Sequence, residues 1–185
     1  MTTIIGIAGS LRTGSYNMSL LRAASEFVLP GTTLEIASIR EFPLYDGDVE
    51  AKGIPDSVQK LKDRIATTNG LLLATPEYNN SIPGVFKNAI DWLTRPPKDV
   101  PRVFRDRPVA IMGATPGAGG TILAQNAWLP VLRTLGTRPW FGGRLIVSGA
   151  NKVFDEAGKL TDETIREKLK GFVEGFEAFV VGTSR

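Results

Sequence analysis

Short apolar runs alternate with longer amphipathic stretches along the whole chain, and this order restricts the fold more than any other feature. The run Gly70–Ala74 is entirely apolar, as expected of a parallel strand that is covered on both faces. A stretch with helical spacing comes before it, with apolar positions at Val58, Leu61 and Ile65. Strands that alternate with helices form parallel sheets through right-handed crossovers. The sequence therefore predicts an α/β fold with a doubly wound parallel sheet and helices on both faces.

The expected elements form one domain that comprises residues 1–185. Strands are expected at 3–8, 34–38, Gly70–Ala74, Pro108–Ala114 and 138–141, with Leu145–Val147 as a candidate continuation of the last. Helices are expected at 17–27, from Pro55 onward, at Gly84–Leu93, at 122–135 and after Thr161. In such sheets ligands bind outside the carboxyl ends of the strands, where the strand order reverses. The loops after the first, third and fourth strands are therefore the candidate functional segments.

Two absences restrict the chemistry. The chain has no cysteine and no histidine, which excludes thiolate nucleophiles, Ser-His-Asp triads and metal sites built on either residue. We therefore expect no metal, and if the protein is an enzyme, a cofactor should carry the reaction. The net charge of +3 and the scattered basic residues give no footprint for nucleic acid. No apolar run is long enough for a membrane span and no targeting segment is evident, so we expect a cytoplasmic protein without membrane insertion.

The first candidate loop, "GSLRTGSYN" at positions 9–17, is rich in hydrogen-bond donors. A polar turn that leads from a strand into a helix offers free N–H groups and the positive end of the helix dipole to an anion. The glycine spacing does not match the dinucleotide fingerprint, and Ser15 occupies the position of the essential lysine of a triphosphate loop. The loop therefore suits one terminal phosphate, and the alternative is a polar turn that only caps the helix. Hydroxyl donors can come from Ser10, Thr13 and Ser15 and a positive charge from Arg12, while Asn17 can cap the helix or bind the ligand.

The second and third loops suit a planar ring. In "TPEYNNSIPG", between Pro76 and Pro83, Tyr78 can form an apolar wall while backbone N–H groups near Asn79 meet ring heteroatoms. In "TPGAGGT", three glycines in four positions allow close approach to the edge of a flat ligand. Taken alone, each loop could equally be a surface turn or a helix cap.

Two stretches resemble the flavodoxin-like NAD(P)H-dependent FMN reductases, a family that includes quinone and chromate reductases. "GSLRTGSYN" is similar to the phosphate loop of that family, and "PEYNNSIPGVFKNAIDW" is similar to its longest motif. The resemblance covers nearly the whole chain and weakens after about Gly142. It implies a five-stranded sheet in the order 2-1-3-4-5, bound FMN and NAD(P)H as co-substrate.

The resemblance also assigns roles to residues. The resemblance implies that the FMN ring lies along the second and third loops and that the phosphate lies against Ser10, Arg12, Ser15 and Asn17. The candidate ring contacts are Pro76, Glu77, Tyr78, Asn79, Thr115, Gly117, Gly119 and Gly120. The flavin would carry the chemistry, so no side chain is named as catalytic, and Tyr78 would line the ring. Lys87, Asn88 and Asp91 match the motif but are interpreted as structural.

Several alternatives remain at this stage. Arg102 and Arg105, in the basic, proline-rich stretch after the helix expected at Gly84–Leu93, could bind a nicotinamide dinucleotide, or the stretch could be a solvated connector. The helix at 122–135 is apolar nearly all round, which predicts a homodimer or homotetramer unless that helix is deeply buried. The expected acceptors are small molecules: quinones, flavins or metal oxyanions such as chromate. The alternatives are a flavodoxin-type FMN electron carrier with protein partners and a phosphate-binding module without redox activity.

Overall fold

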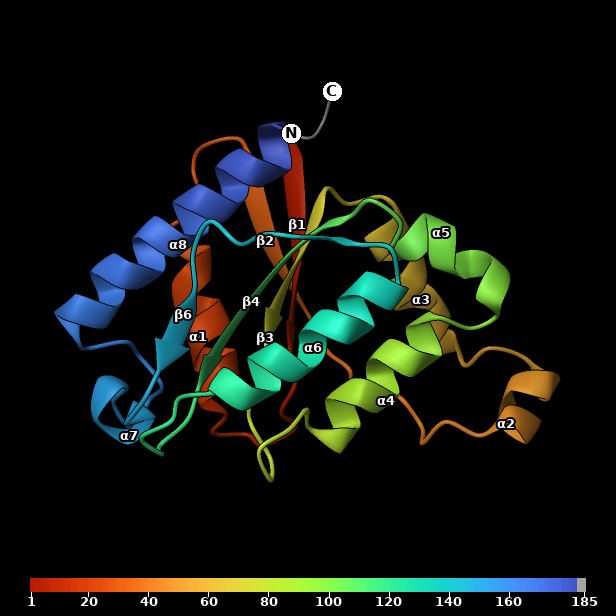
Figure 1. The fold of residues 1–185 in the computed structure, drawn as a ribbon, viewed down its shortest axis with the longest axis horizontal. Coiled ribbons are helices and arrows are strands. Elements are labelled where there is room, and N and C mark those ends of the chain that lie inside the picture. The colour runs from red at the N-terminus through yellow and green to blue at the C-terminus, as the bar shows by residue number, and fades with distance from the viewer. Residues whose placement is uncertain (183–185) are drawn as a thin grey trace.

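In the computed structural model, which describes residues 1–182, a central parallel sheet is covered by helices on both faces (Figure 1). The strands are β1 (Thr2–Ala8), β2 (Thr32–Ala37), β3 (Gly70–Ala74), β4 (Pro108–Ala114), β5 (Arg138–Pro139) and β6 (Leu145–Val147). The longer helices are α1 (Tyr16–Ser25), α3 (Asp56–Ala66), α4 (Gly84–Leu93), α6 (Ile122–Thr134) and α8 (Glu163–Gly182). The short helices are α2 (Gly47–Lys52), η1 (Pro97–Asp99), α5 (Val100–Val103) and α7 (Ala150–Val153), none of which was expected from the sequence.

The strand order is β2-β1-β3-β4-β5, and every pairing in it is parallel, as predicted. The expected fifth strand is in two pieces: β5 pairs with the start of β4 and β6 pairs with its end. The residues between the two pieces leave the sheet. Of the two aromatic residues there, Trp140 is half-buried against Phe172 and Phe141 is exposed. The order reverses between β1 and β3, as in flavodoxin-like sheets. The predicted domain also includes residues 183–185, which lie outside the described part of the chain.

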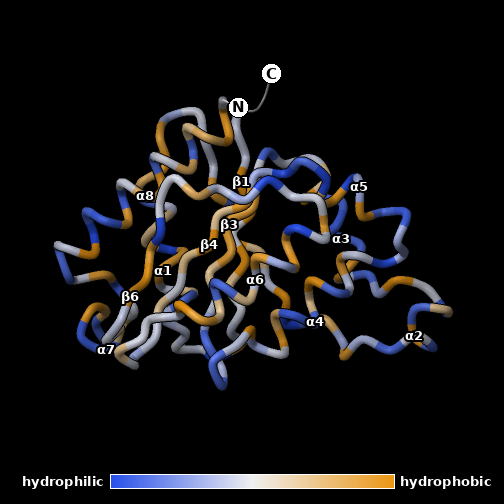
Figure 2. Tube along the Cα trace, viewed as in Figure 1, coloured by the Kyte–Doolittle hydropathy of each residue, from blue (hydrophilic) through white to orange (hydrophobic). Residues whose placement is uncertain are grey.

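The apolar strands separate two hydrophobic clusters. Leu71 and Leu73 belong to the cluster under α3, α4 and α6, whereas Leu72 belongs to the cluster under α1 and α8. Successive side chains of a strand point to opposite faces, so a strand covered on both faces must be apolar at every position. Figure 2 shows this apolar centre running through β1, β3 and β4.

The crossovers fix which end of the sheet can carry a site. Helices α1, α3, α4 and α6 return the chain from the carboxyl ends of the strands to their amino ends, so the loops after β1, β3 and β4 all emerge at one edge (Figure 1). None of the helices within residues 1–182 is long and apolar enough to span a bilayer.

Candidate functional site

A cavity opens where the loops after β1, β3 and β4 meet, and we call it the carboxyl-edge cavity. It brings together most of the residues that the sequence singled out, although they come from three separate parts of the chain. The predicted residues that line it are Ser10, Arg12, Ser15, Asn17, Pro76, Glu77, Tyr78 and Thr115. Tyr16, Ala114 and Pro116 also line it and were not predicted, although each is adjacent in sequence to a residue that was. Asn79, Gly117, Gly119 and Gly120 lie on the same loops but outside the lining.

The first loop leads into the N-terminus of α1. Ser15 is the N-cap of this helix, and its hydroxyl accepts a hydrogen bond from Met18 N at 3.3 Å. Arg12 donates to Gly14 O at 3.3 Å and has no carboxylate partner within residues 1–182. The positive end of the helix dipole and an unpaired guanidinium therefore face the same cavity, which favours an anion there.

Asn17, a candidate phosphate ligand, also makes contacts within the fold. Its amide donates to Ala114 O at 2.9 Å and accepts from Ala114 N at 3.0 Å, and the side chain is buried. This pair of bonds fastens the start of α1 to the end of β4. Asn17 thus positions the first loop against the third.

The second loop forms a tight hairpin at the rim of the cavity. Tyr78 and Ser81 exchange backbone hydrogen bonds of 3.2 and 3.1 Å. Asn79 and Asn80 between them have φ values of 50° and 62°, which asparagine tolerates better than most residues. Tyr78 is 46% exposed, so its ring is open to a stacking partner.

Glu77 joins the second loop to the third. Its carboxylate accepts from Leu123 N at 2.8 Å and from Ala124 N at 3.0 Å, at the N-terminus of α6. Thr121, the N-cap by position, makes no capping bond with its own side chain. A carboxylate at a helix N-terminus also interacts favourably with the helix dipole. Glu77 therefore caps α6 from a different loop, a contact that no local sequence pattern indicates.

The glycines of the third loop fall into two groups. At Gly120, φ is 62° and an added Cβ would lie 1.8 Å from Ile146 Cγ2, so the fold requires glycine there. At Gly119 an added Cβ would meet nothing within 4 Å, and at Gly117 only Thr115 Oγ1 at 3.8 Å. Neither of these two has a left-handed φ. Glycine at Gly117 and Gly119 is therefore not explained by the fold, whereas close approach of a flat ligand would explain it.

Arg102 and Arg105 are not at the cavity. Helix α4 has ten residues and runs about 15 Å, which takes the chain from the carboxyl edge back to the amino edge before the basic stretch begins. Figure 1 accordingly shows α5 at the end of the sheet away from the cavity. The sequence left open whether this stretch rims the cavity or is a solvated connector, and its position at the amino edge favours the connector.

Asp99 and Arg102 of this basic stretch pair with each other and with charged residues of α3. Lys62, which is fully buried on α3, lies with its Nζ 2.6 Å from Asp99 Oδ2 and also donates to Arg95 O. Arg102 lies 3.3 Å from Asp99 and 2.9 Å from Asp63. The hydrogen bond from Lys62, more than that from Arg102, holds the pKa of the Asp99 carboxyl below its ordinary value. This network anchors the segment to α3 and leaves the Arg102 guanidinium paired.

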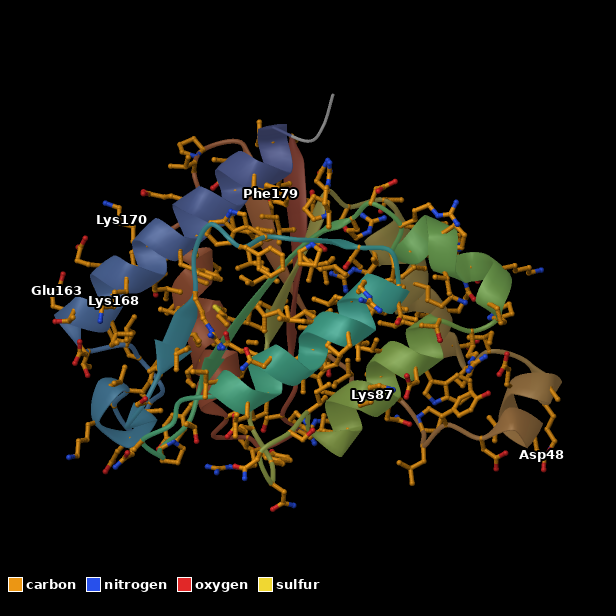
Figure 3. The ribbon with its side chains drawn as sticks, viewed as in Figure 1. Asp48, Lys87, Glu163, Lys168, Lys170 and Phe179 are labelled. Atoms are coloured by element: carbon orange, nitrogen blue, oxygen red, sulfur yellow. The ribbon has the colours of Figure 1, made fainter. Side chains whose placement is uncertain are left out.

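The remaining motif residues on α4 contact one another and the segment before α2. Lys87 forms an ion pair with Asp91 at 2.7 Å on the surface of α4 (Figure 3). Asn88 donates to Pro43 O and accepts from Tyr45 N, so it holds the segment before α2. Within residues 1–182 no cluster of acidic side chains could hold a metal ion.

The geometry matches that of known proteins. Residues 2–152 match the family model described as NADPH-dependent FMN reductase. The chain is 41% identical over 177 residues to an NAD(P)H-dependent FMN reductase from Pseudomonas aeruginosa, covering 96% of this chain and 94% of the relative. It is 36% identical over 174 residues to a quinone reductase from Pseudomonas putida, covering 94% and 92% of the two chains.

A solved structure gives the same result for the fold. FerB, an NAD(P)H:(acceptor) oxidoreductase from Paracoccus denitrificans, superposes with a TM-score of 0.88 at 33% identity and covers 98% of each chain. The chain therefore belongs to the NADPH-dependent FMN reductase family, oxidoreductases of flavodoxin-like fold with FMN as cofactor and NAD(P)H as co-substrate.

Proposed function

We propose that this protein is an FMN-dependent reductase that takes electrons from NAD(P)H and passes them to quinones, with free flavins and metal oxyanions such as chromate as further acceptors. The observation that carries the proposal is the carboxyl-edge cavity, which combines an anion-binding helix terminus with an open rim formed by Tyr78 and the third loop. A relative from Pseudomonas putida is named a quinone reductase, which supports quinones as the first acceptors to test.

The residues present fit a flavin mononucleotide. Ser10, Arg12 and the N-terminus of α1 would hold the phosphate, with each charge-assisted hydrogen bond contributing roughly 1.5–3 kcal/mol. Pro76, Tyr78 and Asn79 would line one side of the ring. On the third loop, from Thr115 to Gly120, the open Cβ positions of Gly117 and Gly119 leave room for the ring edge.

When bound, FMN supplies hydride and two-electron transfer, chemistry that needs neither a histidine nor a cysteine from the protein. The chain orients the reactants: Asn17 and Glu77 fix the three loops relative to one another through their backbone contacts. Tyr78, half-exposed at the rim, offers an aromatic face on which a nicotinamide or quinone ring can stack. No side chain is assigned a proton-transfer role.

An absorption spectrum tests the proposal directly. We expect purified protein supplied with FMN at micromolar concentration to retain a yellow chromophore that NADPH bleaches under anaerobic conditions. Steady turnover of NADPH should follow on addition of benzoquinone, and assays with free FMN and chromate compare the other acceptors. Arg12→Gln should weaken FMN binding, whereas Arg133→Gln on the last turn of α6 should not.

The second candidate is a flavodoxin-type FMN electron carrier, favoured by the fold alone. Bleaching by NADPH without turnover of small acceptors would support the carrier. A protein that stays colourless with FMN would instead be a phosphate-binding module and would contradict both candidates.

We also propose that the protein is a cytoplasmic homodimer or homotetramer. Helix α6 leaves Ile122, Leu123 and Leu129 exposed along one side, a face that a second copy could cover. Light scattering coupled to size-exclusion chromatography measures the mass in solution, and a monomer at micromolar concentration would contradict the assembly.

A further inference from the structure

A second cavity lies beside the carboxyl-edge cavity, between the loops that follow β1 and β2, and we call it the β1–β2 cavity. Its wall consists of the first loop, one side of α1 and the residues after the end of β2. Three guanidinium groups line it, from Arg12, Arg22 and Arg40. It shares Ser10 and Arg12 with the carboxyl-edge cavity, so a ligand could occupy both.

The two loops that form this cavity carry the same short pattern. Ser10-Leu11-Arg12 follows β1 and Ser38-Ile39-Arg40 follows β2. In each, the serine hydroxyl oxygen accepts from the backbone N–H of the arginine two residues later, at 3.4 Å and 3.2 Å respectively. Because the hydroxyl oxygens act as acceptors, each serine keeps its own proton for donation to a ligand. The Arg40 side chain also donates to Leu11 O and so joins the loops.

The positive charges of this cavity are not neutralised by the fold. No acidic residue lines the cavity, and none of its three arginines forms an ion pair within residues 1–182. The carboxylate one turn after Arg22 belongs to Glu26, which lies 3.4 Å from Arg166 instead. Other arginines do have a carboxylate partner, for example Arg64 with Glu35 at 2.5 Å, whereas this cavity supplies none. Three unpaired guanidinium groups around one cavity repel each other and favour an anion with several acceptor oxygens.

We propose that the β1–β2 cavity binds the 2′-phosphate of NADPH and gives the enzyme a preference for NADPH over NADH. The two donors differ only by this phosphate, and guanidinium and hydroxyl groups are the donors that recognise it. A cavity selective for NADH would instead need a carboxylate to accept from the free ribose hydroxyl, and this one has none. The shared residues place the cavity beside the phosphate end of the proposed FMN site, at the same edge of the sheet as the loops that would hold the ring. The inference rests on the proposed reductase function.

Binding of nucleotide fragments tests this inference without turnover. Calorimetry on FMN-loaded protein should give at least tenfold tighter binding of 2′,5′-ADP than of 5′-AMP. The double variant Arg22→Gln/Arg40→Gln should abolish that difference and leave the Kd for FMN unchanged, because neither residue lines the carboxyl-edge cavity. Arg133→Gln, which removes one positive charge from an exposed position on α6, should keep the preference.

Steady-state kinetics gives the second readout. The double variant should raise KM for NADPH at least tenfold while KM for NADH and kcat with either donor stay within about twofold. Equal binding of 2′,5′-ADP and 5′-AMP to the unaltered protein would overturn the inference. An equal rise in KM for NADPH and NADH in the double variant would also overturn it. Inorganic phosphate bound as tightly as 2′,5′-ADP would show a simple anion site and also overturn it. Selective binding of 2′,5′-ADP by a protein that never reduces an acceptor would instead refute only the proposed function.

Discussion

The loops of the carboxyl-edge cavity and residues 95–107 are both polar, but they differ in whether their charged side chains form ion pairs. In the cavity, Arg12 donates only to a backbone carbonyl, at 3.3 Å. In the other segment, Asp99 pairs with Lys62 at 2.6 Å and Arg102 pairs with Asp63 at 2.9 Å. The first arrangement leaves charge for a ligand, and the second uses it to hold the fold. A charged stretch in a sequence therefore indicates a binding site only if the fold leaves its charges unpaired.

The largest effects are expected at two glycines of the third loop, one required by the fold and one that we expect FMN to require. Gly120→Ala should lower the free energy of unfolding by about 3 kcal/mol, because it combines a left-handed φ with a clash against Ile146. Gly119→Ala should leave the unfolding free energy nearly unchanged but weaken FMN binding at least tenfold. Urea denaturation and fluorescence titration with FMN measure the two quantities. If Gly119→Ala binds FMN normally, close approach at that position is not the reason for its glycine.

The next effect tests the paired segment. Asp99→Ala should lower the free energy of unfolding by about 3 kcal/mol, the low end for breaking a buried ion pair, because it leaves the fully buried Lys62 without its carboxylate. FMN affinity should not change, since the network lies at the amino edge. Asp63→Ala is the matched control: this carboxylate is mostly exposed, so its loss should lower the free energy of unfolding much less than the loss of Asp99. Equal costs for the two variants would show that the Lys62 pair does not stabilise the fold.

The same network predicts a dependence on pH. The pKa of Asp99 is lowered in the folded protein, mainly by the hydrogen bond from Lys62. Its contribution to stability is therefore complete above the ordinary carboxyl pKa of about 4 and is lost as the pH falls through the lowered folded value. Urea denaturation from pH 6 to pH 2 should give a shallower decline for Asp99→Asn than for the unaltered protein. Parallel declines would contradict this assignment.

The contrast between the two regions also shows what the sequence could predict. The alternation at Leu71–Leu73 was readable because a strand covered on both faces has a simple pattern. Lys62 had a usable signal as well: it lies four residues after Val58 and three before Ile65, on the apolar face of α3. The capping of α6 by Glu77 had no signal in the sequence, because Leu123 and Ala124 lie 46 and 47 positions after Glu77. Contacts within one element were predictable, whereas contacts between loops depend on how the whole sheet assembles.

A smaller effect tests that contact between loops. Glu77→Ala should lower the free energy of unfolding by about 1 kcal/mol, the usual cost of losing a helix cap. FMN binding should weaken several-fold because the second loop would no longer be held against α6. Glu77→Gln keeps an acceptor oxygen, so it should lower the free energy of unfolding and the FMN affinity less than Glu77→Ala does. If Glu77→Ala alters stability alone, the carboxylate caps the helix without positioning the cavity.

The smallest effect is expected where the sequence first suggested a nicotinamide site. Arg102→Gln/Arg105→Gln should change KM for NADH and NADPH by less than about twofold, because the segment lies at the opposite edge of the sheet from the cavity. The loss of the exposed pairs of Arg102 should cost under about 1 kcal/mol of unfolding free energy. Arg22→Gln/Arg40→Gln removes the same total charge at the β1–β2 cavity, so it is the matched comparison for an effect of net charge. A rise in KM for both donors in the Arg102→Gln/Arg105→Gln variant alone would contradict the separation, because it would mean that paired charges at the amino edge still contribute to donor binding.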